Sequence, residues 1–207
     1  MKLRNTMLMV LFLCHAFCVG CSSQPDYEGY ESRWLAAFSD DDTLKELLDD
    51  INRELAERPD DARLLRIRLS LSSHAGDNAA AVKDIYRLAE LFPDAPYYQF
   101  EKCLVLERMQ GAGETAIQCY AAILPLYEKE FATDELKRNA MYITTALLAE
   151  SPDAESLKEN FLRAAGDDAQ TLVEKELLRH FDRKTYVQGI MPPESPPVNA
   201  PQALPKR

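Results

Sequence analysis

Two cysteines are the residues of this chain best suited to covalent chemistry. Residues 97–109 and 114–129 are expected to be helices and residues 111–113 a turn, which places Cys103 and Cys119 on opposite arms of a hairpin. In an oxidising compartment two thiols can form a disulfide if their Cα atoms come within about 7 Å. The alternative is two small buried thiols, since free cysteine is among the most buried residue types. The sequence leaves both interpretations open.

No other residues form a recognisable catalytic pattern. Beyond the N-terminal segment the only histidines are His74 and His180, and neither belongs to a spacing that would place two metal ligands on one helix face. A thiol inside an apolar helical pattern is normally inert, and no glycine-rich phosphate loop is present. The carboxylate runs stand at expected helix starts or on solvated faces: 40–42, 49–50 and 167–168. We therefore expect no enzyme, no metal, no cofactor and no small-molecule substrate.

The helices that would carry these residues follow a repeat of 34 positions. Pro59 and Pro93 are 34 residues apart, in the similar contexts RPDDA and FPDAP. Upstream apolar positions repeat with the same offset, and a third copy follows with one extra residue, at Ala116, Ile117, Tyr120, Ile123 and Leu124. Paired helices with this period are typical of tetratricopeptide repeats. The chain resembles that family over about residues 43–130.

These patterns predict an all-α fold, a short right-handed stack of antiparallel helical hairpins over residues 30–183. An aromatic-rich first helix, which could cap the N-terminal edge of the stack, is expected at Tyr27, Tyr30, Trp34 and Phe38. The other expected helices span 44–58, 62–74, 79–92, 97–109, 114–129, 134–150, 154–165 and 169–182. Residues 184–207 hold six of the chain's 12 prolines. Such a segment is expected to be a disordered tail, so removing everything after Asp182 is expected to leave thermal unfolding nearly unchanged.

The first two dozen residues have the pattern of a secretory signal. Lys2 and Arg4 precede an apolar stretch at 7–19, which ends in Val-Gly-Cys at Cys21. This resembles the lipobox of bacterial lipoproteins, which implies a signal peptide over 1–20, lipidation of Cys21 and a tether over 21–29. In that family a residue other than aspartate after the cysteine, here serine, favours the periplasmic side of the outer membrane. The alternatives are an ordinary cleaved signal and an uncleaved anchor, and all three place the rest of the chain outside the cytoplasm.

The acidic net charge of the chain excludes some classes of binding partner. The formal net charge of −10 disfavours nucleic acid, which needs clustered basic residues, and also a polybasic hold on anionic lipid. A protein partner could instead bind the groove that stacked hairpins create. Arg63 and Arg66 share a helix face and could bind a carboxylate, while Tyr97 and Tyr98 could anchor an interface. The alternative is solvated arginines paired with the aspartates at 60–61, and tyrosines used in core packing.

Two classes of function fit these features. The first is a membrane-anchored periplasmic adaptor that binds envelope proteins through a helical groove, as tetratricopeptide lipoproteins do in outer-membrane assembly, secretion or wall remodelling. The second is an immunity lipoprotein that neutralises a toxin in the periplasm. An adaptor should bind several partners and show an envelope defect when deleted, whereas an immunity protein should bind one toxin tightly and matter only in its presence.

Overall fold

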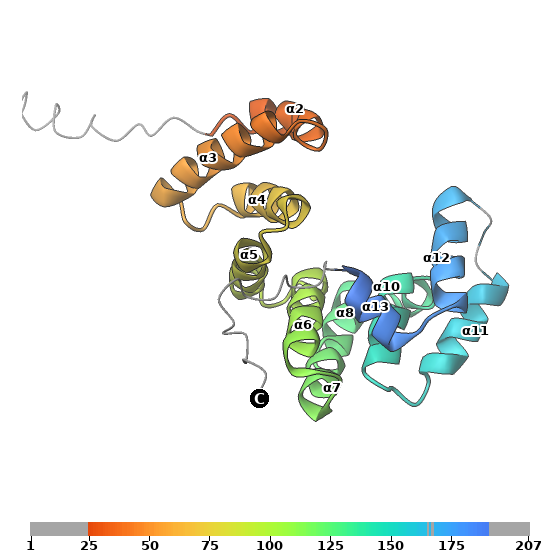
Figure 1. Ribbon diagram of the computed structural model, residues 1–207. Helices are drawn as coiled ribbons and strands as arrows, with labels where there is room; N and C mark the ends of the chain where they lie inside the picture. Colours follow the sequence, from red (N-terminus) through yellow and green to blue (C-terminus); the bar gives the residue numbers. More distant parts are fainter. Residues whose placement is uncertain (1–24, 165, 167, 191–207) are drawn as a thin grey trace, which may run out of the picture.

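The structure is a computed structural model that describes residues 25–164, 166 and 168–190 (Figure 1). The predicted signal peptide, Cys21 and the proline-rich residues 191–207 lie outside the described residues. Those described are helical and include no strand, which confirms the all-α prediction for this part of the chain. None of these helices has both the length and the apolar character needed to cross a membrane.

The helices follow one another with short connections. Their bounds are α2 Tyr27–Ala37, α3 Asp41–Glu57, α4 Ala62–Ala75, α5 Asn78–Leu91, α6 Pro96–Gln110, α7 Glu114–Ala121, α8 Leu124–Glu130, α9 Thr133–Leu136, α10 Ala140–Leu148, α11 Ala154–Ala164, α12 Ala169–Arg179 and α13 Arg183–Ile190. Each helix from α2 to α6 packs against the next one in the sequence. Figure 1 shows α2 to α5 following one another in succession and the later helices gathered beside α6.

Aspartates begin many of these helices. The side chains of Asp40, Asp61, Asp77 and Asp168 each accept a hydrogen bond from a backbone amide in the first turn of the helix that follows. Such a cap contributes about 1 kcal/mol because it satisfies an amide that has no partner within the helix. Gly76 ends α4 in the left-handed conformation, φ 74°, which glycine adopts without strain. The acidic runs of the sequence thus include the residues that start its helices.

The repeat at Pro59 and Pro93 has a structural counterpart. The residue before each proline ends a helix with nearly the same backbone, φ −132° and ψ 68° at Arg58 and φ −126° and ψ 67° at Phe92. In both connections the amide three residues on donates to the carbonyl of that residue, over 3.1 and 3.2 Å. Proline cannot continue a helix, so the two positions impose the same turn on the chain.

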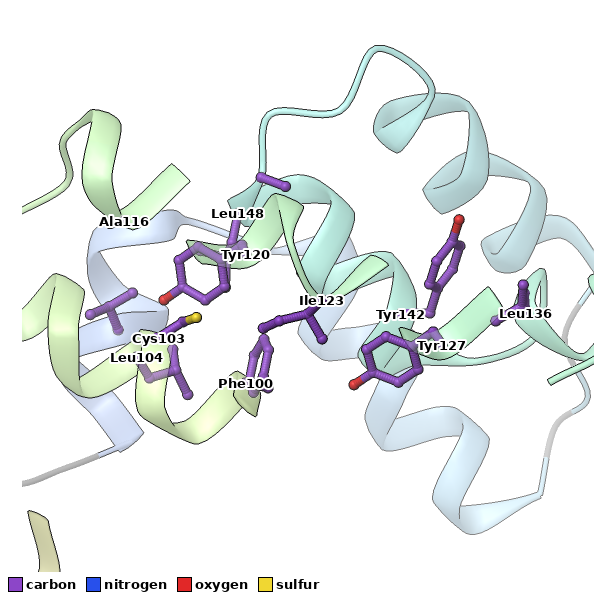
Figure 2. Packing of buried hydrophobic residues seen from close by; sticks show 12 residues of the cluster. Phe100, Cys103, Leu104, Ala116, Tyr120, Ile123, Tyr127, Leu136, Tyr142 and Leu148 are labelled. Atoms are coloured by element: carbon purple, nitrogen blue, oxygen red, sulfur yellow. The ribbon is translucent and has the colours of Figure 1, made fainter. Parts of the chain in front are cut away.

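Two hydrophobic clusters hold the helices together. The first lies among α2 to α5 and includes the fully buried Leu47, Leu64 and Leu88. The second joins α6, α7 and α8 to α10 and α13 (Figure 2), and its members are Phe100, Cys103, Leu104, Ala116, Tyr120, Ile123, Tyr127, Leu136, Tyr142, Leu148, Ala149 and Val187. A smaller cluster, Ala81, Ile85 and Val105, connects α5 to α6. A fourth cluster, Ile143, Phe161 and Leu178, holds α10, α11 and α12 together.

Two predicted helices are each interrupted. The helix expected over 114–129 is broken between α7 and α8, where Pro125 occupies the first turn of α8. Proline lacks the amide that would have continued α7 and its ring clashes with the preceding turn. The helix expected over 134–150 is broken before Asn139, whose side chain caps α10 by accepting a 3.0 Å hydrogen bond from the amide of Tyr142. Capping residues compete with helix continuation because they favour an extended backbone.

Both predicted ends of the helical domain are shifted. The expected first helix is present as α2, and it takes residues 27–29 from the tether predicted at 21–29, because Asp26 caps the helix there. Residues 184–190 were expected in the tail but form most of α13, in which Val187 is 7% exposed and packs in the second cluster. Asp182 was an overlooked local signal, because its side chain accepts a 2.8 Å hydrogen bond from the amide of Thr185 at the start of α13. Contacts with distant residues then hold the helix in place.

Candidate partner-binding face

A disulfide joins α6 to α7. Cys103 and Cys119 are bonded, with their Cα atoms 5.7 Å apart, as the first of the two interpretations of the sequence required. Cys103 is 1% exposed and lies in the second cluster beside Phe100 and Tyr120. Bonded sulfurs with these surroundings serve as a structural cross-link and leave no thiolate for catalysis.

The histidines do not build a site. His74 is exposed and its ring lies against Phe38, 4.5 Å between centroids. His180 is exposed near the end of α12 and faces Glu176 one turn earlier. Within the described part of the chain, no group of three His, Cys, Asp or Glu residues is close enough to hold a metal ion.

A surface pocket lies between α2 and α4. Its volume is about 320 Å³ and its lining residues are Glu31, Trp34, Arg63, Arg66, Ile67 and Ser70. The indole nitrogen of Trp34 donates a 3.2 Å hydrogen bond to the hydroxyl of Ser70 and so fixes the ring across the two helices. The face that carries this pocket and continues to Tyr97 on α6 is called the α2–α4–α6 face below.

Arg63 is committed to contacts within the chain. Its Nε and Nη2 both donate to Oε1 of Glu31, over 2.9 and 2.7 Å, and its guanidinium lies 4.5 Å above the ring of Tyr27. The hydroxyl of Tyr27 in turn donates to Asp61. The alternative in which the Arg63 side chain pairs with the aspartates at 60–61 is therefore wrong. The side chain binds Glu31 of α2 instead. This arginine holds α2 against α4.

Arg66 differs from its neighbours because it is exposed and forms no ion pair with any residue that the structure describes. It lies near Tyr97, which comes from α6 and is 53% exposed. Desolvation raises the pKa of the Tyr97 phenol and the Glu101 carboxylate raises it further, while the positive charge of Arg66 acts in the opposite direction. The structure thus brings together two of the four predicted groove residues, a free guanidinium and an exposed aromatic ring.

Tyr98 belongs to the core. Its ring stacks on Phe92 at 5.2 Å, and the side chain packs against the first hydrophobic cluster. Sequence reasoning also missed residues of this face, Glu31 and Trp34 on α2 and Glu101 on α6. The helical spacing of Tyr97 and Glu101, four residues apart, was a usable signal for Glu101. The contributions of α2 could not be read from spacing because they depend on how two helices pack.

Comparisons of the chain with protein-family models, with curated proteins and with solved structures find no match. The function is therefore inferred from the residues and their geometry.

Proposed function

We propose that this protein is a membrane-anchored periplasmic lipoprotein that binds a protein partner of the cell envelope through its α2–α4–α6 face. The observation that carries the proposal is the exposed pair Arg66 and Tyr97. Arg63 and Arg68, on the same helix, are neutralised by acids of the chain itself, whereas Arg66 is left for an outside group. Aromatic and arginine side chains are the residues that most often dominate the energy of a protein interface.

A tetratricopeptide-like stack is the arrangement proposed to present this face. It is supported by the matched turns at Pro59 and Pro93 and by the packing of each helix from α2 to α6 against the next. In such a stack the first helix of each pair lines one surface, which here means α2, α4 and α6. The adaptor role is the form of the proposal that we favour over toxin immunity.

Affinity capture from envelope fractions tests the binding role. The wild-type chain is expected to retain one or more envelope proteins, and Arg66→Glu and Tyr97→Ala are each expected to weaken that binding by at least about tenfold, the usual effect of losing an interface anchor. Lys83→Glu is the matched control because it reverses a charge on α5, outside this face. Equal binding by all three variants would contradict the proposed face. Capture of a single toxin would instead support the immunity role.

The lipid anchor has a separate test. Cys21→Ala is expected to abolish incorporation of a palmitate analogue, because the thiol of the lipobox cysteine is the acceptor of the lipid. Cys18→Ala is the control and should still be labelled. Labelling that survives in the Cys21 variant would refute the anchor without bearing on the binding face.

A further inference from the structure

Glu101 is a half-buried carboxylate that forms no ion pair with any cation of the described residues. It lies on α6 one turn after Tyr97 and one turn before Val105, on the side of α6 that packs toward α5. Its Oε2 atom is buried and has no hydrogen-bond partner among the described residues. The Tyr97 hydroxyl donates a hydrogen bond to the carboxylate. Desolvation raises the pKa of the carboxyl, and this hydrogen bond lowers it by a smaller amount.

The two fully buried carboxylates of the described residues, Asp84 and Glu107, are each paired with an arginine. Asp84 accepts hydrogen bonds from Nε and Nη2 of Arg68, over 2.8 and 2.6 Å. Glu107 accepts from Nε and Nη2 of Arg183, over 2.7 and 3.1 Å. A buried charge without a partner is costly, and native proteins nearly always satisfy it. Glu101, on the same helix as Glu107, has a hydroxyl as its partner and no arginine.

We infer that Glu101 is a recognition site for an arginine side chain of the protein partner, which would pair with its carboxylate against the ring of Tyr97. The inference rests on the proposed function, since the arginine comes from a bound protein. Guanidinium matches a carboxylate with two parallel hydrogen bonds and also stacks on aromatic rings, and Tyr97 offers an exposed ring one helical turn away. A basic partner suits the acidic chain, whose net charge is −10.

The free protein provides the first test. Glu101→Gln removes a half-buried charge that has no cation beside it, so it is expected to raise the midpoint of urea unfolding at neutral pH. The raised pKa means that the native state holds the proton more tightly than the unfolded state. The wild-type penalty should therefore grow as pH rises from the unfolded-state pKa to the native one, and vanish below the unfolded-state value. Glu114→Gln, which removes an exposed charge at the start of α7, should not raise the midpoint, because a negative charge is favourable at a helix N-terminus. A midpoint lowered by Glu101→Gln would show that the carboxylate already has a cation partner within the chain and would overturn the inference.

The second test measures recognition directly with a small probe. Full-length protein carrying ¹³Cδ-labelled glutamate is titrated by NMR with N-acetyl-arginine methylamide and, as a neutral control of the same shape, N-acetyl-citrulline methylamide. The arginine probe is expected to lower the pKa of Glu101, each unit corresponding to about tenfold tighter binding to the ionised form, and citrulline should not. A Glu101 signal that neither probe moves, or that both move equally, would overturn the inference.

The two proposals fail in different ways. If no envelope protein is captured, the proposed function fails, whatever the probe does. If a partner is captured and Glu101→Gln retains it as well as Glu114→Gln does, the face binds a protein but Glu101 does not recognise it. Loss of capture in Glu101→Gln alone, by at least about tenfold, is the result expected.

Discussion

Replacing Arg183 by methionine is expected to lower the free energy of unfolding by about 3–5 kcal/mol, the effect of breaking a buried ion pair from one side. Glu107 is 4% exposed, and Arg183 is the residue that neutralises it. Methionine keeps most of the length and apolar area of the arginine stem, so the lost free energy of unfolding is due mainly to the missing positive charge. The same guanidinium donates a 2.9 Å hydrogen bond to the carbonyl of Leu148, and it lies 5.9 Å from the ring centroid of Tyr120.

Urea unfolding followed by circular dichroism measures this change. Arg179→Met is the matched control, because Arg179 is an exposed arginine on α12 whose ion pair with Glu176 lies on the surface, and its loss should cost well under 1 kcal/mol. Adding Glu107→Gln to Arg183→Met should restore part of the stability, since the buried charge is then gone as well. A loss in Arg183→Met no larger than in the control would mean that α13 does not neutralise Glu107.

The ion pair between Arg183 and Glu107 also changes the result expected from truncating the C-terminus. The sequence predicted that removing residues after Asp182 would leave thermal unfolding nearly unchanged. With α13 docked through Arg183 and Val187, a chain that ends at Asp182 should instead lose at least as much stability as Arg183→Met. A chain that ends at Ile190 keeps these contacts and should unfold like the full-length protein.

What the sequence predicted well are features set by neighbouring residues. Pro59 and Pro93 end helices by their own covalent structure, and Asp61 and Asp77 begin helices by bonding amides two or three residues away. Pro125 was the same kind of signal, and it was overlooked because the apolar pattern continues across it. The 34-residue repeat was informative for the same reason, since the two prolines impose the same turn twice.

The sequence could not predict ion pairs between residues that are far apart along the chain. Arg183 meets Glu107 across 76 positions, and Arg63 meets Glu31 across 32. The sequence identified Arg63 and Arg66 as equivalent candidates because both lie on one face of a helix. Only the packing of α2 against α4 shows that the first is neutralised and the second is free. The lack of a cation beside Glu101 is a property of the same kind, because it depends on where the arginines and lysines of other helices lie.

Removal of the disulfide is the second large expected effect. The bond closes a loop of 16 residues, and the chain-entropy estimate for that length is about 3 kcal/mol, lost when Cys103 and Cys119 are both replaced by alanine. Reduction of the wild-type protein by dithiothreitol should shift urea unfolding by nearly the same amount and should not affect the double variant. A wild-type midpoint that does not respond to reductant would show that the cysteines are not bonded in solution.

The disulfide and the ion pair are attached to adjacent turns of α6, because Cys103 and Glu107 are four residues apart on that helix. Neighbouring sites usually show coupled losses of stability. Here the losses are expected to add to within about 0.5 kcal/mol, because the disulfide acts mainly by restricting the unfolded chain while Arg183 acts in the native state. A combined variant of Arg183→Met with both cysteines replaced tests this by a double-mutant cycle. A combined loss clearly smaller than the sum would mean that the disulfide instead holds α6 in the position that Glu107 needs to meet Arg183.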